Sequence, residues 1–169
     1  LKPDVTMVAE RAPAAAASDT AFLDFPYVDS VSAAKVPAFA WLTRQADNST
    51  IFSARAPEFR RVQLASKTDD AGQPITGIEL SPDGTHIAYL TGVPRPGEPF
   101  NPGSMVPAPA VKLWLMPTTP GAKAIDLGDA SEPSFSPDGR KLLIKRDGDL
   151  WVVDMRAPSA KPKLFAKGG

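Results

Sequence analysis

PSFSPDGRKLLI, residues 133–144, places the tetrapeptide Ser-Pro-Asp-Gly between two apolar runs. Proline fixes φ for the second position of a turn, aspartate tolerates the third, and glycine adopts the left-handed conformation that sends the chain back. The stretch therefore predicts a β-hairpin, and we expect the glycine of this turn to have φ above zero.

A near copy of this stretch, IELSPDGTHIAYL, occupies residues 78–90 and superposes on it with Ser81 on Ser136 and Gly84 on Gly139. A second similarity joins VKLWLMPTTPGAKAIDL at 111–127 to GDLWVVDMRAPSAKPKLF at 148–165, and it pairs Trp114 with Trp151. Self-similarity over such distances is typical of a repeat architecture.

The two turns lie farther apart in the chain than the two tryptophans do, so the earlier repeat must contain an insertion between its turn and its tryptophan. We expect this insertion in the Pro- and Gly-rich segment 91–109. A third and weaker copy, NSTIFSARAPEFRRVQL at 48–64, lacks Ser-Pro-Asp-Gly and aligns Ile51 with Trp114 and Trp151.

Each repeat predicts four short strands, because alternating and β-branched or aromatic residues recur in runs of four to six between turn signals. Such a unit of about 40 residues is typical of a propeller blade. The fold prediction is an all-β chain that forms a partial β-propeller of about three four-stranded antiparallel blades, at 36–66, 73–128 and 131–166. An irregular N-terminal segment, 1–35, is predicted as a tail or linker because ERAPAAAASDT at 10–20 is low in complexity.

Composition excludes several function classes. The chain has 169 residues, and its 19 basic side chains balance its 19 acidic ones. We therefore expect neither nucleic acid nor an anionic membrane as a partner. No apolar run approaches the roughly 18 residues of a membrane span. Zero cysteines remove disulfides and thiolate chemistry, and the first residue, a leucine, suggests a processed or truncated product.

The run FAWLTRQADNSTIFSARAPEFRRVQLAS at 39–66, the GEPFNP of the insertion and both Ser-Pro-Asp-Gly repeats carry a family resemblance. Over residues 38–165 the chain resembles the first propeller blades of bacterial serine peptidases of the prolyl oligopeptidase and dipeptidyl peptidase family. The resemblance implies a non-catalytic propeller that gates peptide access to a C-terminal α/β-hydrolase domain of the same parent protein. It favours a periplasmic or secreted location. The alternative is a TolB-like propeller that binds a protein partner.

The chemistry of such a peptidase is not encoded in these residues. The family's nucleophile lies in a Gly-x-Ser-x-Gly elbow, which this chain lacks, and we interpret its single histidine, His86, as a surface strand residue. Adjacent paired glutamates, which hold the substrate amino group in the family, are also missing. Asp69, Asp70, Asp147 and Asp149 indicate turns rather than calcium, because the spaced oxygen ligands are missing. We assign no catalytic residue, metal or cofactor.

Aromatic and basic residues suggest packing rather than ligand binding. Trp41, Trp114 and Trp151 lie in predicted strands, so we favour sheet-to-sheet packing over a stacking platform for bases or sugars. The basic PEFRRV at 57–62 is predicted to be a solvated edge of an outer strand.

The insertion is the candidate binding element. Successive connections of a four-stranded meander alternate between its two ends, so segment 91–109 is predicted at the end opposite the Ser-Pro-Asp-Gly turns. Loops of this length usually bind or cover something. We expect Arg95 and Glu98 to contact the substrate or the hydrolase domain, and the alternative is a decorative surface loop. We also expect self-association through unpaired strand edges, because three blades do not close a propeller.

Overall fold

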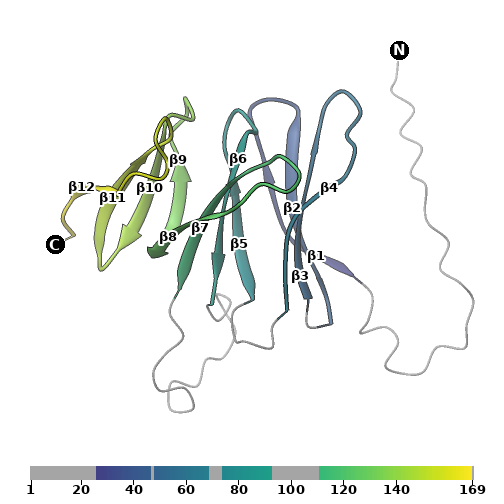
Figure 1. Ribbon diagram of the computed structural model, residues 1–169, viewed down its shortest axis with the longest axis horizontal. Coiled ribbons are helices and arrows are strands. Elements are labelled where there is room, and N and C mark those ends of the chain that lie inside the picture. Colours follow the sequence, from purple (N-terminus) through teal and green to yellow (C-terminus); the bar gives the residue numbers. More distant parts are fainter. Residues whose placement is uncertain (1–25, 47, 69–73, 93–110, 169) are drawn as a thin grey trace, which may run out of the picture.

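The computed structural model describes residues 26–46, 48–68, 74–92 and 111–168, and these residues form only strands, turns and irregular connections. None of the described residues belongs to a helix that is long and apolar enough to cross a bilayer. Within the described residues, twelve strands form three separate four-stranded antiparallel sheets, which lie side by side in a row (Figure 1). We call the sheets blades 1, 2 and 3 in chain order.

In every blade, consecutive strands are neighbours in the sheet. The prediction of an all-β partial propeller with about three antiparallel blades is therefore confirmed. Blade 1 contains β1 (Tyr27–Ala33), β2 (Ala38–Gln45), β3 (Asn48–Arg55) and β4 (Val62–Thr68); blade 2 contains β5 (Ile75–Leu80), β6 (His86–Thr91), β7 (Lys112–Pro117) and β8 (Ile125–Asp129); blade 3 contains β9 (Ser131–Phe135), β10 (Lys141–Arg146), β11 (Asp149–Asp154) and β12 (Lys163–Ala166).

Strand β1 lies within residues 1–35, the segment predicted as a tail, so blade 1 begins at Tyr27 and not at the predicted boundary of 36. The sequence YVDSVSA of β1 is rich in serine, which weakens its strand signal. Its backbone nevertheless pairs with β2 from Tyr27 opposite Arg44 to Ala33 opposite Phe39. Long-range pairing therefore fixes this strand where local propensity does not.

The turn chemistry agrees with the sequence. Gly84 and Gly139, the glycines of the two Ser-Pro-Asp-Gly turns, both have φ of 68°, as predicted. In the β10–β11 turn, Asp147 and Gly148 have φ of 51° and 84°. Two consecutive positive φ values are the signature of the tight hairpin turn whose twist matches that of the flanking strands.

Two hydrophobic cores fill the spaces between the blades. The core between blades 1 and 2 has a centre of side chains that are fully or almost fully buried: Ala40, Leu42, Ile51, Ile75, Ile87, Tyr89 and Met116. The core between blades 2 and 3 is built in the same way from Ala88, Leu113, Leu115, Leu142, Ile144 and Val153. Because successive side chains of a strand point to opposite faces, each blade has one face toward the preceding blade and one toward the following blade.

The repeat alignment was one residue out of register in blade 1. Trp114 packs against the core that blade 2 shares with the preceding blade, whereas Ile51 faces the following blade. Phe52 lies on the opposite face from Ile51 and pairs with Trp41, so Phe52 is the equivalent of the two tryptophans. A shift of one residue moves a strand side chain to the other face of the sheet.

The first strands of the blades, β1, β5 and β9, lie next to one another. The connections that follow them meet at one end of the blades, which we call the turn end. There the backbone N–H of Lys35 donates to Pro82 O at 2.9 Å, and Lys35 Nζ reaches Pro137 O at 2.9 Å. The strand ends that flank residues 93–110 lie at the other end, the insertion end, as the meander predicted (Figure 1).

Candidate functional site

The predicted contact residues Arg95 and Glu98 lie outside the described residues, and so does most of segment 91–109. What the structure describes is the frame from which the insertion departs. Thr91, the last residue of β6, pairs directly with Lys112, the first residue of β7. The two chain ends of the insertion are therefore held side by side at the insertion end.

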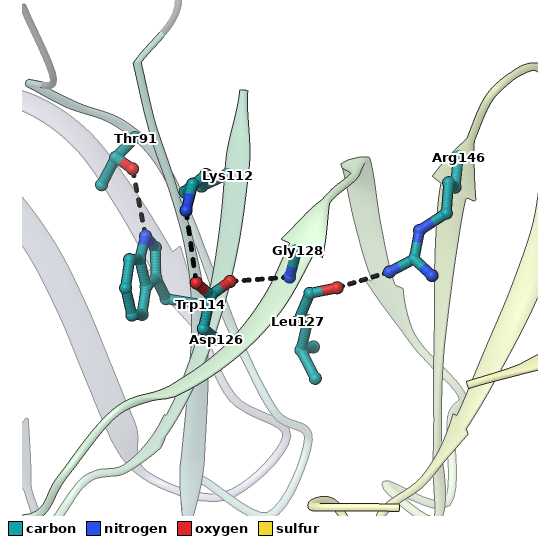
Figure 2. A network of polar contacts seen from close by, with 7 residues as sticks. All are labelled: Thr91, Lys112, Trp114, Asp126, Leu127, Gly128 and Arg146. Atoms are coloured by element: carbon teal, nitrogen blue, oxygen red, sulfur yellow. Dashed lines mark hydrogen bonds and ion pairs between the residues drawn. The ribbon is translucent and has the colours of Figure 1, made fainter. Parts of the chain in front are cut away.

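A tryptophan fixes one side of this frame. The indole Nε1 of Trp114 donates to Thr91 Oγ1 at 3.0 Å, and Thr91 is fully buried (Figure 2). The ring of Trp114 stacks on Tyr89 with 6.3 Å between centroids, and Lys67 Nζ of blade 1 lies 5.2 Å from the Trp114 ring centroid. The end of β6 is thereby tied to the core between blades 1 and 2.

Asp126 holds the other side of this frame in place. Asp126 lies 3.5 Å from Lys112 Nζ, and its second carboxylate oxygen accepts a hydrogen bond from Gly128 N at 2.7 Å (Figure 2). Gly128 has φ of 79°, so the β8 chain bends at this point. Burial, assisted by the charge of Asp126, raises the pKa of Tyr89 to about 12, so Tyr89 stays neutral at physiological pH.

Arg146 connects this frame to blade 3. Its guanidinium donates to the backbone carbonyls of Leu127 and, at 3.2 Å, of Asp129, both in β8 of blade 2 (Figure 2). The same guanidinium lies 5.6 Å from the ring centroid of Trp151. A side chain of blade 3 therefore fastens the outer strand of blade 2.

Arg44 has the corresponding role between blades 1 and 2. It is 4% exposed and donates to Ser49 Oγ at 2.9 Å and to the Ile75 carbonyl of blade 2 at 2.6 Å. Its Nε lies 3.3 Å from Asp29 Oδ2. A buried guanidinium is tolerated because its donors reach a carboxylate, a hydroxyl and a carbonyl.

Sequence reasoning did not identify either arginine. Arg146 occupies the position of Thr91 when the two Ser-Pro-Asp-Gly turns are superposed, and Arg44 takes the next inward position after Ala38, Ala40 and Leu42 in β2. A charged residue at a strand position where the alternation predicts a buried apolar side chain was a usable signal of a buried polar contact. Its partners were not readable, since they are backbone carbonyls of a different blade.

The turn end carries the single histidine. His86 begins β6, and its Nδ1 lies 2.9 Å from Thr85 Oγ1. It is half-buried, so its interpretation as a surface strand residue holds only for part of the side chain. Burial lowers the pKa of His86, and the nearby Asp83 charge opposes that shift. Burial therefore favours the neutral form of the ring.

The aspartate of each Ser-Pro-Asp-Gly turn serves the turn itself. Asp83 Oδ1 accepts hydrogen bonds from Ser81 Oγ at 2.6 Å and from Thr85 N at 3.1 Å. Burial alone would raise the pKa of Asp83, but these hydrogen bonds outweigh it and lower the pKa. Asp138 makes the same pair of contacts in blade 3, and the hydrogen bond from Ser136 is the main cause of its lowered pKa.

The acidic pairs do not form a metal site in the described part of the chain. No group of three His, Cys, Asp or Glu residues able to hold a metal ion occurs there. Asp147 forms the β10–β11 turn, and Asp149 accepts a hydrogen bond from Gly168 N at 2.9 Å. Asp69 and Asp70 lie outside the described residues.

The tryptophans divide between the two cores and the outer face of blade 1. Trp114 and Trp151 pack against the two cores, as predicted. Trp41 instead lies on the face of blade 1 that points away from blade 2, where it stacks on Phe52 at 5.7 Å. Arg61 lies 4.9 Å from the Phe52 centroid. The predicted solvated edge at 57–62 is exposed up to the start of β4 at Val62.

Comparison with solved structures supports the fold. An acylaminoacyl peptidase from Pyrococcus horikoshii aligns with 87% of this chain at 17% identity, with a TM-score of 0.53. An acylaminoacyl peptidase in complex with Z-Gly-Gly-Phe-chloromethyl ketone aligns with 89% at 18% identity, with a TM-score of 0.54. The chain spans about a quarter of the length of these peptidases, 26% and 27%. No family model matches the chain, and no curated protein does. At this identity the likeness shows a β-propeller fold and no more.

Proposed function

We propose that this chain is a non-catalytic propeller segment of a serine peptidase that resembles the prolyl oligopeptidase and dipeptidyl peptidase family. In this proposal the propeller limits, by size, which peptides reach a hydrolase domain outside residues 1–169. The supporting observation is the row of three meander blades, which aligns over almost its whole length with part of the acylaminoacyl peptidases.

The insertion end is the proposed contact side. Thr91 and Lys112 hold the two ends of the insertion side by side, and Arg146 ties the same frame to blade 3. A loop on so rigid a base could present Arg95 and Glu98 to a peptide or to the hydrolase domain in a fixed position. Long loops carried by a rigid scaffold are where binding residues are usually found.

The first test is the sequence of the parent polypeptide beyond residue 169. The proposal expects a hydrolase domain with a Gly-x-Ser-x-Gly elbow. If only further blades follow, the TolB-like protein-binding propeller takes its place and the peptidase proposal is wrong.

The second test uses the parent peptidase. Residues 93–109 are replaced by a Gly-Asn turn, and hydrolysis is followed with a series of peptides of increasing length. We expect unchanged turnover of the shortest peptides and an altered size limit. A Gly-Asn replacement of Thr119–Pro120, at the turn end, is the matched control. An unchanged size limit in the insertion variant would leave a decorative loop.

The isolated chain gives a third test. Purified residues 1–169 should not hydrolyse chromogenic dipeptide or oligopeptide substrates, because no nucleophile elbow is present. Turnover that persists in the His86→Ala variant after repurification would contradict the non-catalytic assignment.

A further inference from the structure

The turn end contains a hollow of about 260 Å³ between blades 1 and 2. Blade 1 lines it with the start of β2 at Ala38, the end of β3 and the β3–β4 connection, and blade 2 lines it with Leu80, Gly84 and Thr118. The walls therefore come from two adjacent blades that both lie within the described residues. The hollow is at the opposite end of the blades from the insertion, so it is separate from the proposed contact side.

Hydrogen bonds hold the walls of this hollow in place. Thr118 Oγ1 donates to Gly84 O at 2.8 Å, and Arg55 Nη1 of blade 1 donates to Asp83 O of blade 2 at 3.1 Å. The blades approach closely here, because a Cβ on Gly84 would lie 2.9 Å from Ala38 Cβ. The hollow is therefore a preformed feature of two blades that are bonded to each other.

The floor of the hollow is apolar apart from one hydroxyl. Ala38 and Leu80 are 3% and 4% exposed, and Ser53, which also lines the hollow, is 8% exposed. The Ser53 hydroxyl has no hydrogen-bond partner among the described residues. A buried polar group without a partner is unfavourable, so this hydroxyl favours a ligand that supplies a hydrogen bond.

The rim of the hollow carries charges of both signs. Arg55, Glu58 and Arg60 are exposed, and none of the three forms an ion pair within the described part of the chain. A guanidinium has five N–H donors, and the Asp83 carbonyl occupies one donor of Arg55. The other donors can bind a carboxylate through two parallel hydrogen bonds. Glu58 attracts a positively charged group to the same rim.

We propose that this hollow binds a free α-amino acid with an apolar side chain of about the size of leucine. The carboxylate of the ligand meets Arg55 and Arg60, its ammonium group faces Glu58, and its side chain lies on the apolar floor. The volume is below the roughly 300 Å³ at which pockets for drug-sized ligands begin, which selects a ligand of few atoms. An inorganic dianion is disfavoured, because Glu58 contributes a like charge.

Isothermal titration calorimetry of the purified chain with L-leucine tests the proposal. We expect one leucine per chain with a Kd on the order of 0.1 mM, because a ligand of so few atoms makes few contacts. Leucinamide, which lacks the carboxylate, should bind ~10-fold more weakly or worse. The ammonium-free analogue 4-methylpentanoate should also bind more weakly. No saturable binding of L-leucine, or equal affinity for either analogue, would overturn the proposal.

Two variants locate the ligand. Ser53→Val removes the hydroxyl and adds methyl groups in the hollow, and Arg55→Gln removes the charge but keeps an N–H donor. Each should weaken L-leucine binding ~10-fold or more. Arg140→Gln, at an exposed arginine beside the turn of blade 3, is the matched control and should bind like the wild type. Wild-type affinity in both hollow variants would place leucine elsewhere and overturn the site.

Folding of each variant is checked by circular dichroism. Arg60→Gln, on the exposed β3–β4 connection, replaces Arg55→Gln if that variant does not fold. Glu58→Gln then tests the orientation of the ligand. It should weaken the binding of L-leucine and leave that of 4-methylpentanoate unchanged or stronger, because only leucine carries an ammonium group. Equal weakening of both ligands would contradict the contact with Glu58.

The parent polypeptide provides the last measurement. It should bind L-leucine with the affinity of the chain, and so should the parent in which residues 93–109 are replaced by Gly-Asn, because the insertion lies at the other end of the blades. A parent that does not bind leucine would show that another segment fills the hollow, and the proposal would be wrong. The size limit for peptides is measured separately, so the two proposals can fail independently.

Discussion

Blades 2 and 3 share a turn tetrapeptide, a strand order and a tryptophan in the third strand, but they satisfy that tryptophan differently. In blade 2 the indole N–H of Trp114 donates to Thr91. In blade 3 the equivalent position holds Arg146, which has no acceptor atom, and the buried indole N–H of Trp151 has no hydrogen-bond partner among the described residues. The difference shows that one repeat can use the same position for its own stability or for a link to its neighbour.

The arginine compensates between blades. Its guanidinium covers the Trp151 ring and donates to two carbonyls of blade 2. Blade 3 thus loses one internal hydrogen bond and gains an attachment to blade 2. Among the described residues the two blades also differ in coverage, since blade 2 is packed on both faces and blade 3 on one.

The largest expected effect is the difference in stability lost when equivalent side chains of blades 2 and 3 are shortened. Leu115→Ala should lower the free energy of unfolding by about 2–5 kcal/mol, because Leu115 is fully buried between blades. Val152→Ala, at the equivalent position of blade 3, should cost about 1 kcal/mol or less because the side chain is half-buried.

Urea unfolding measures both changes. Equal losses at the two positions would show that blade 3 is covered on both faces.

The next largest difference is expected between substitutions at the two turn glycines, Gly84 and Gly139. Both have φ of 68°, so alanine at either costs about 1 kcal/mol of backbone strain. A Cβ on Gly84 would also lie 2.9 Å from Ala38 Cβ, whereas the nearest atom to a Cβ on Gly139 is 3.8 Å away. We therefore expect Gly84→Ala to lower the melting temperature more than Gly139→Ala, as followed by circular dichroism. Equal shifts would mean that the start of β2 at Ala38 moves aside without cost.

The two tryptophans give a smaller difference. Trp114→Phe leaves the buried Thr91 hydroxyl without its donor, whereas Trp151→Phe removes an N–H that has no partner among the described residues. Both variants lose similar ring volume, so the excess cost of Trp114→Phe isolates the hydrogen bond and should be about 1 kcal/mol. Denaturant unfolding of the two variants measures it. A larger loss for Trp151→Phe would contradict the unpaired indole.

The smallest effect concerns Glu79, whose place in blade 3 is taken by Ser134. Burial raises the pKa of Glu79 above its ordinary 4.5. The folded state therefore favours the protonated acid, and this contribution is complete below pH 4.5 and is lost as pH rises through the folded pKa. Glu79→Gln should match the wild type at pH 4 and melt slightly higher at pH 7.

Glu58→Gln, at an exposed glutamate of blade 1, is the control for Glu79→Gln and should show no such pH-dependent gain. A melting temperature of Glu79→Gln below that of the wild type at pH 7 would mean that the carboxylate has a stabilising partner.

Much of the fold was readable from local chemistry. Ser-Pro-Asp-Gly located two hairpins and their positive φ, and the superposition of Ser81 on Ser136 located the two blades around them. The first strand was missed because YVDSVSA has a weak local signal, and Ile51 was aligned one residue out because the third repeat has no such turn to fix its register. The candidate contacts Arg95 and Glu98 remain a prediction.

The sequence by itself determined the repeat, the turns and the alternation of apolar side chains, because these depend on φ, ψ and residue type within a few positions. Only the tertiary structure decided which face of each blade meets the preceding or the following blade, and which polar groups join them. Arg44 and Arg146 bind backbone carbonyls of blade 2, and every residue except proline presents the same backbone groups. Such partners leave no trace in residue identity, so spatial proximity alone selects them.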